Sequence, residues 1–210
     1  LLGYYQTGTA DERAAHFTKA VTLEPKRYEE ALIHEALRDN VPEVRDAVRL
    51  AIAKQYRSAP GRIRKELTEA LEGGDNRSRH DAAWVIGYRA ATDGALAGVI
   101  SDALDNKRMA TRLNAILAVD ELARQDAQKA RRYVPQLRAK IESAPKPTWK
   151  TLWMGDGERE SPEVRALAVT TLGTIGATDE ILKVLQNKGS SLRSNAMKAL
   201  IASGAGESAV

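Results

Sequence analysis

Few residues in this 210-residue chain have the types and spacing that catalysis requires. His80 and Asp81 are neighbours, as an imidazole and a carboxylate could be in a general acid–base pair. Adjacent helical positions point about 100° apart, so these two side chains would need help from another repeat to share one site. The sequence has no paired carboxylates, phosphate loop or nucleophile elbow, and Gly73-Gly74-Asp75 is typical of a turn. We therefore expect no catalytic residues and no enzymatic activity.

Metal and cofactor chemistry is also not expected. The chain has no cysteine, which excludes thiolate ligands, disulfides and covalent haem attachment. His16, His34 and His80 are too far apart to form a metal-binding motif. The sequence predicts neither a metal site nor a cofactor.

Basic residues cluster in one part of the chain, although the formal net charge is only +4. Between positions 124 and 150 they far outnumber the acidic residues. Such a cluster could contact phosphates or an acidic protein, or it could simply be a solvated helix face. The candidate contacts are Arg131, Arg132, Arg138 and Lys140.

The composition predicts helices as the elements that position these residues. Hydrophobic residues make up 43% of the chain and aromatic residues only 5%, so the interior must contain much alanine, which suits closely packed helices. No apolar run is long enough for membrane insertion, and no signal peptide is visible. The chain begins at Leu1 without Met, so we expect a piece of a longer, bacterial protein, either cytoplasmic or periplasmic.

An internal repeat organises the chain. The tetrapeptide Pro42-Glu43-Val44-Arg45 recurs as Pro162-Glu163-Val164-Arg165. Small or β-branched residues follow each arginine by three positions and aliphatic ones by seven, which places both on one helix face. The same pattern surrounds three more arginines, so the anchor arginines are Arg45, Arg79, Arg112, Arg165 and Arg193.

Each anchor helix is preceded by another amphipathic stretch, so the repeating unit is a helical hairpin. The stretches are Tyr28–Leu37, Arg62–Leu71, Ala95–Leu104, Tyr133–Ile141 and Asp179–Leu185. The predicted fold is all-α, an α-solenoid of about six hairpins. The spacing leaves about 20 surplus residues before Arg165, which predicts a loop insertion at residues 143–160.

The pattern of a turn rich in Asp and Asn, Pro-x-Val-Arg, alanine, an aliphatic residue and glycine resembles the HEAT-repeat family, particularly short bacterial HEAT-like repeats. The predicted HEAT-like domain is 28–210. The resemblance implies a solenoid in which each repeat packs only against its neighbours. It also implies a ladder of ion pairs between the anchor arginines and acidic turn residues, with Asp75 as the best-placed partner.

Residues 1–27 follow a different pattern. Tyr4, Gly8, Phe17 and Ala20 have the relative spacing of a tetratricopeptide repeat, although Arg13 occupies a position where that family has a small residue. We interpret this segment as a tetratricopeptide-like hairpin or an ordinary capping hairpin.

Positions one, five and nine after each anchor point away from the buried face. They predict an accessible stripe at His80, Trp84 and Tyr88, flanked by Leu113 and Leu117. Exposed aromatic and apolar surface of this kind often marks an interaction site. The alternative is a rotated helix in which Trp84 belongs to the core.

Two tryptophans, Trp149 and Trp153, lie in the predicted insertion. They could seal the groove between repeats, or they could project as a recognition element. Our first functional hypothesis is a noncatalytic scaffold that binds another protein through its concave face and this loop. The alternatives are a nucleic-acid-binding solenoid and a HEAT-like DNA glycosylase, in which Trp84 and Asp81 would hold a damaged nucleotide.

Overall fold

The computed structural model describes residues 7–23, 36–57, 60–142 and 160–204. Within these ranges the secondary structure is entirely helical. The chain divides into two compact units, Leu1–Ala103 and Leu104–Val210. None of the described helices combines the length and the apolar composition that crossing a membrane requires.

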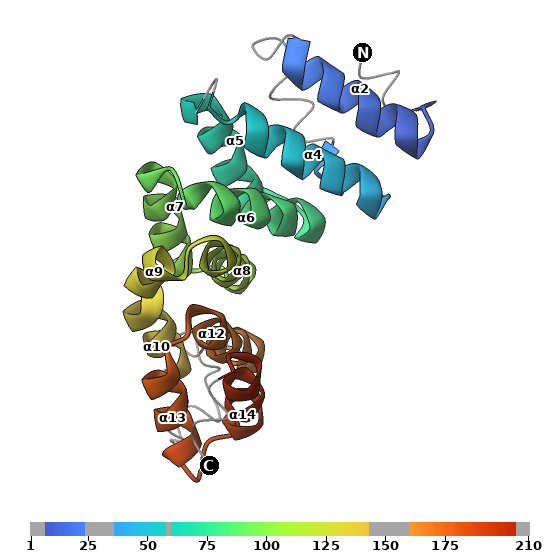
Figure 1. Ribbon diagram of the computed structural model, residues 1–210. Helices are drawn as coiled ribbons and strands as arrows, with labels where there is room; N and C mark the ends of the chain where they lie inside the picture. The colour runs from blue at the N-terminus through green and yellow to red at the C-terminus, as the bar shows by residue number, and fades with distance from the viewer. Residues whose placement is uncertain (1–6, 24–35, 58–59, 143–159, 205–210) are drawn as a thin grey trace. The chain divides into compact units, whose positions relative to one another are not determined.

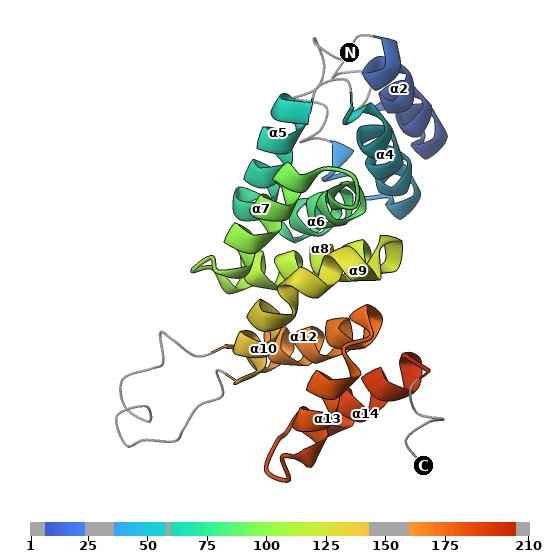
Figure 2. The same cartoon turned by 60° about the vertical axis from the view of Figure 1, so that its left-hand side comes forward.

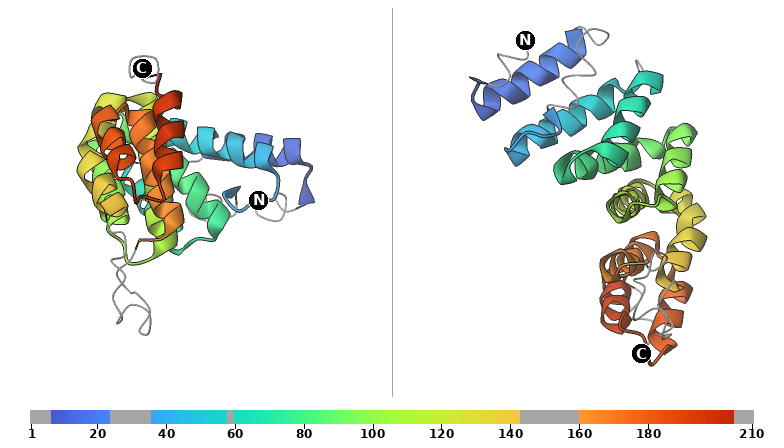
Figure 3. Two further views of the ribbon diagram at one scale, coloured as in Figure 1. Left: turned by 90° about the horizontal axis from the view of Figure 1, so that it is seen from below. Right: turned by 180° about the vertical axis from the view of Figure 1, so that it is seen from behind.

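The first unit is built around the central helix α4. This helix packs against α2 on one side and α6 on the other, while α5 forms a hairpin with α6 (Figures 1 and 3). The last helix, α7, ends at the first residue of the second unit. The bounds are α2 (Ala10–Leu23), α4 (Pro42–Gln55), α5 (Pro60–Gly73), α6 (Asn76–Ala90) and α7 (Gly94–Leu104).

The second unit repeats this arrangement around α12. Helix α12 packs against both α8 and α14, with α10 and α13 as the first helices of the hairpins (Figure 2). The bounds are α8 (Met109–Gln125), α9 (Ala127–Ala130), the 3₁₀ helix η1 (Arg131–Tyr133), α10 (Val134–Glu142), α12 (Pro162–Ile175), α13 (Thr178–Gln186) and α14 (Arg193–Ala202).

Helix boundaries follow local sequence signals. Pro162 opens α12, and the Ser161 hydroxyl accepts a hydrogen bond of 3.2 Å from the backbone N–H of Val164. The same helix ends at Gly176, whose φ of 74° lies in the left-handed region that glycine adopts without strain. Thr9 and Glu12 form a reciprocal capping box at the start of α2, because each side chain accepts from the other's backbone N–H.

The predicted helix phase is confirmed at every anchor. The residues three and seven positions after each anchor arginine are at most 5% exposed, so they form the core between helices. These residues are Val48, Ile52, Ala82, Ile86, Ala115, Val119, Ala168, Leu172, Ala196 and Leu200.

The all-α class predicted from the sequence is confirmed, and each unit is built by stacking the second helices of consecutive hairpins. Most of the predicted Tyr28–Leu37 helix and nearly all of the insertion at 143–160 lie outside the described residues, as does the start of the predicted opening hairpin. Helices α9 and η1 were not predicted, because a four-residue helix followed by a single 3₁₀ turn has no measurable periodicity.

Candidate functional site

The predicted accessible face is present on α6. His80 is exposed, and Trp84 and Tyr88 are half-buried, whereas Val85 and Ile86 between them are fully buried. Trp84 is therefore not a core residue, which removes the alternative of a rotated helix. We call His80, Trp84 and Tyr88 the α6 stripe.

The aromatic side chains of the α6 stripe form an ordered stack. The rings of Trp84 and Tyr88 are 5.1 Å apart between centroids, with 15° between their planes. The guanidinium of Arg49, on α4, lies 5.0 Å from the centroid of the Trp84 ring, within cation–π range. Leu50, also on α4, is 48% exposed. Two neighbouring repeats thus contribute to one surface of aromatic and apolar side chains.

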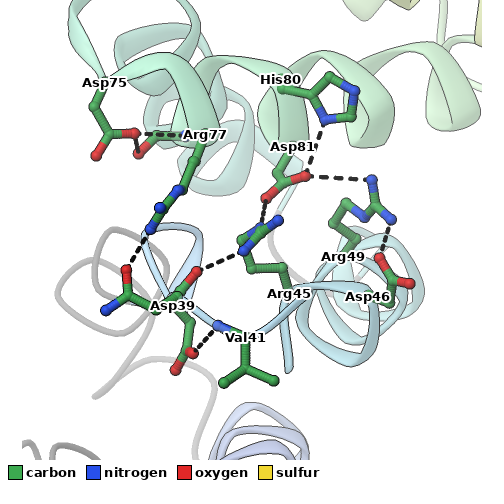
Figure 4. A network of polar contacts seen from close by, with 11 residues as sticks. Asp39, Val41, Arg45, Asp46, Arg49, Asp75, Arg77, His80 and Asp81 are labelled. Carbon is green, nitrogen blue, oxygen red and sulfur yellow. Dashed lines mark hydrogen bonds and ion pairs between the residues drawn. The ribbon is translucent and has the colours of Figure 1, made fainter. Parts of the chain in front are cut away.

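A buried carboxylate lies beneath this surface. Asp81 is 2% exposed and pairs with Arg45 Nε at 3.0 Å and with Arg49 Nη1 at 3.2 Å (Figure 4). His80 Nδ1 lies 3.2 Å from the Oδ1 atom of the same carboxylate. His80 and Asp81 therefore contact each other directly, although they are adjacent on one helix, and the two arginines of the preceding repeat bind only Asp81.

A second carboxylate, in addition to Asp81, holds the Arg49 guanidinium. Arg49 forms an ion pair with Asp46, which is one turn earlier on α4 (Figure 4). Because two carboxylates hold this guanidinium, the contact between Arg49 and Trp84 is preorganised rather than dependent on a partner.

The two leucines predicted to flank the stripe lie in the second unit. Leu113 and Leu117 are both half-buried, one turn apart on α8. They form an apolar strip of their own on that unit.

A ladder of ion pairs is present, but with other carboxylates than the one expected. Arg45 pairs with Asp81 of the next anchor helix, and its Nη1 donates to the backbone carbonyl of Asp39 at 2.7 Å. Asp75, the partner favoured by the sequence, caps α6 instead by accepting from the Ser78 N–H at 2.8 Å. Burial would raise the pKa of Asp75, but its hydrogen bonds from Ser78 and the charge of Arg38 together lower it. The assignment of Asp75 to the ladder was therefore wrong.

Two ladder pairs are bidentate. Arg13 Nε and Nη2 lie 2.8 and 3.0 Å from the two carboxylate oxygens of Asp39. Arg112 holds Glu160 in the same way, at 2.7 and 2.8 Å. In both arginines the remaining Nη1 donates to a backbone carbonyl in the turn before its own helix.

Arg13, Asp39 and Glu160 were not predicted from the sequence as ladder residues. Arg13 lacks the full anchor pattern, because His16 rather than a small residue lies three positions later, and it was interpreted as a departure from the tetratricopeptide pattern. Asp39 lies six residues before its anchor, Arg45, whereas the predicted ladder partner lies four residues before the anchor, as Asp75 does before Arg79. The position six residues before an anchor has a detectable signal, because Asp39, Asn106 and Asn187 each occupy it and accept from the backbone N–H two residues later.

The basic candidates of the second unit divide into two pairs. Arg131 and Arg132 are exposed, and the Arg132 guanidinium lies 5.8 Å from the ring centroid of Tyr133. Arg138 instead pairs with Glu142 at 2.6 Å, and Lys140 pairs with Asp105 at 3.0 Å. Two of the four residues predicted to contact phosphates, Arg138 and Lys140, are therefore already paired with carboxylates of the same unit.

Trp149 and Trp153 lie outside the described ranges. Across the described ranges, no group of three or more His, Cys, Asp or Glu residues is placed to hold a metal ion.

Helix content and stacking define an all-α helical repeat protein. No protein-family model matches the chain, and no curated protein matches it. Among solved structures, an engineered protein from a structural genomics consortium is similar with 14% identity and a TM-score of 0.41, over 97% of this chain and 95% of its own. A designed armadillo repeat protein is similar with 17% identity and a TM-score of 0.38, over 96% and 97%.

Proposed function

We propose that this chain is a noncatalytic, HEAT-like scaffold that binds another protein through the α6 stripe. The observation that carries the proposal is the stacked pair of Trp84 and Tyr88, which is half-buried although Val85 and Ile86 between the two rings are fully buried. Aromatic residues and arginine are enriched where protein interfaces gain most of their binding free energy. Leu113 and Leu117 on α8, and Trp149 and Trp153 of the insertion, are further contact candidates.

The rigidity of this surface supports binding. The Trp84 ring contacts Tyr88 on its own helix and Arg49 on α4, and Arg49 is itself held by Asp46 and Asp81. Side chains that are ordered before association lose little conformational entropy when a partner binds. An extended partner could therefore use the stripe without reorganising it.

The glycosylase alternative loses its main support. It requires the carboxylate of Asp81 to meet a nucleotide, but this group is 2% exposed and neutralised by Arg45 and Arg49. A carboxylate in that position stabilises the junction between repeats, and we do not propose it as a catalytic residue.

Nucleic-acid binding remains a second candidate because Arg131 and Arg132 are exposed on adjacent positions. The pairing of Arg138 and Lys140 with carboxylates reduces the charge available to phosphates. Retention on duplex DNA that falls steeply with salt, and falls further in an Arg131→Gln, Arg132→Gln variant, would favour this candidate.

Affinity capture from an extract of the source cells tests the proposed function. We expect a partner protein that binds the wild type and is lost with Trp84→Ala and with Tyr88→Ala. Lys65→Ala, which removes a 66% exposed side chain from α5, is the matched control and should retain the partner. Melting temperatures within a few degrees of the wild type would show that all variants are folded. Identical capture by all four proteins would contradict the proposal.

A further inference from the structure

A cleft of about 260 Å³ lies in the second unit between α10, α12 and α13. Its wall includes Arg138, Arg165 and Lys183, together with the carboxylates of Glu142 and Glu180 and the aliphatic side chains of Ile141 and Val184. The cleft is separate from the α6 stripe and from the residues that carry the proposed function.

The charges in this cleft are unequally paired. Arg138 lies 2.6 Å from Glu142, and Lys183 lies 2.8 Å from Glu180. Arg165 donates through Nε to the backbone carbonyl of Ile141 at 3.1 Å, and within the described residues it has no ion pair. Its two terminal nitrogens therefore remain as hydrogen-bond donors in a cleft whose other cations are neutralised.

The turn that follows Arg165 lacks the carboxylate that Arg13 and Arg112 find in the corresponding turns. Arg13 and Arg112 each hold a carboxylate from the turn before the next anchor helix. In the turn after Arg165 the equivalent of Asp39 is Asn187, six residues before Arg193. Asn187 keeps the turn geometry of Asp39, since its side chain accepts from the Gly189 N–H at 3.2 Å, but an amide carries no negative charge.

We propose that the Arg165 cleft is a binding site for a carboxylate carried by a peptide with an adjacent aliphatic side chain. Arg165 would hold the carboxylate end-on through its two terminal nitrogens, as arginine does in bidentate pairs. Ile141 and Val184 would contact the aliphatic group, and Asn187 and Ser190 supply neutral polar atoms at the rim. The carboxylate could come from an acidic side chain or from a chain terminus.

Three short peptides distinguish these sources. Acetyl-Ala-Leu with a free carboxyl terminus presents a terminal carboxylate, acetyl-Asp-Leu-amide presents a side-chain carboxylate, and acetyl-Asn-Leu-amide presents neither. We expect one or both carboxylate peptides to shift the amide NMR signals of residues around the cleft at millimolar concentration, and the neutral peptide to leave them unchanged. Binding of all three peptides alike, or of none, would overturn the proposal.

Variants test the role of Arg165. Arg165→Gln should weaken peptide binding at least about tenfold, because charge-assisted hydrogen bonds carry the recognition. Lys188→Gln is the matched control: it removes one positive charge from an exposed position in the nearby turn that does not line the cleft, and should bind as the wild type does. Equal losses in both variants would show a general charge effect and refute a site at Arg165.

Asn187→Asp provides a test that does not depend on Arg165→Gln being folded. This substitution restores the carboxylate that Asp39 supplies to Arg13, so it should raise the melting temperature and abolish binding of the carboxylate peptides. A variant that keeps wild-type peptide affinity would show that Arg165 is not the recognition group.

Discussion

Arg13 of α2 and Asp39 of the turn before α4 form a bidentate ion pair, with distances of 2.8 and 3.0 Å. The Asp39 side chain is only 5% exposed, and its Oδ1 also accepts from the Val41 N–H at 2.9 Å. The carboxylate thus orders its own turn and fastens it to the preceding helix. Figure 4 shows Asp39 together with the next ion pair of the ladder, from Arg45 to Asp81.

The first prediction concerns this pair. Arg13→Ala should lower the free energy of unfolding by about 2 kcal/mol, because it leaves a largely buried carboxylate without its counter-ion. Arg38→Ala is the control, since Arg38 is half-exposed and lies 3.9 Å from Asp75; it should cost less than about 0.5 kcal/mol. Urea denaturation measures both. Equal effects would indicate that α2 folds independently, as a separate tetratricopeptide-like hairpin would.

Asp81→Asn should be more damaging. Loss of this buried charge leaves Arg45 without a carboxylate and Arg49 with only the exposed Asp46, and removing one partner of a buried pair typically costs about 3–5 kcal/mol. Asp46→Asn removes the other carboxylate from Arg49, but Asp46 is 62% exposed, so we expect a loss below about 1 kcal/mol. Comparable denaturation midpoints for the two variants would refute a central role for Asp81.

Gly173 and Gly98 form a matched pair of helical glycines. A methyl group at Gly173 would lie 3.0 Å from the Cβ and the carbonyl oxygen of Ala199, so Gly173→Ala should separate α12 from α14 and cost about 1–3 kcal/mol. Nothing lies within 4 Å of a methyl group at Gly98, which is exposed on α7. Gly98→Ala should therefore stabilise the protein, by about 0.5–1 kcal/mol from helix propensity. Calorimetry that showed the same sign for both would contradict the close approach of α12 and α14.

Alkaline pH should destabilise the second unit through Tyr133. Burial raises the pKa of Tyr133 to about 12, and the charge of Arg132 opposes this only in part. A folded-state pKa above the unfolded value of about 10 means that the stabilisation is complete below pH ~10 and lost as the pH rises towards about 12. Melting temperatures measured across this range should fall more steeply for the wild type than for Tyr133→Phe. Parallel curves would show that Tyr133 does not titrate with unfolding.

Much of the fold could be predicted because the helix period is local. Once Arg79 was recognised as an anchor, Ala82 and Ile86 had to face the core and Trp84 had to point away from it, and the structure places all three accordingly. The stacking of Trp84 on Tyr88 also follows from their four-residue spacing on one helix.

The polar partners could not be predicted in this way. In the sequence, Asp81 could form an acid–base pair with its neighbour His80. Its burial and its ion pair to Arg45 depend on how α4 packs against α6. The same applies to the cation over Trp84, because Arg49 comes from a helix that is separated from Trp84 by the whole of α5. Contacts of this kind leave no periodic signal in one sequence.

The sequence by itself determined the class of fold, the phase of each anchor helix and the residues left accessible on α6, since all three depend on residues within a few turns of one another. Only the tertiary structure decided which carboxylate each anchor arginine holds. Asp39, Asp81 and Glu160 lie 26, 36 and 48 residues from Arg13, Arg45 and Arg112 respectively, and the distance between each pair is fixed by the packing of successive hairpins. For the same reason, only the packed structure shows that Arg165 and Asn187 line one cleft, whereas Arg45 and Arg112 each hold a carboxylate.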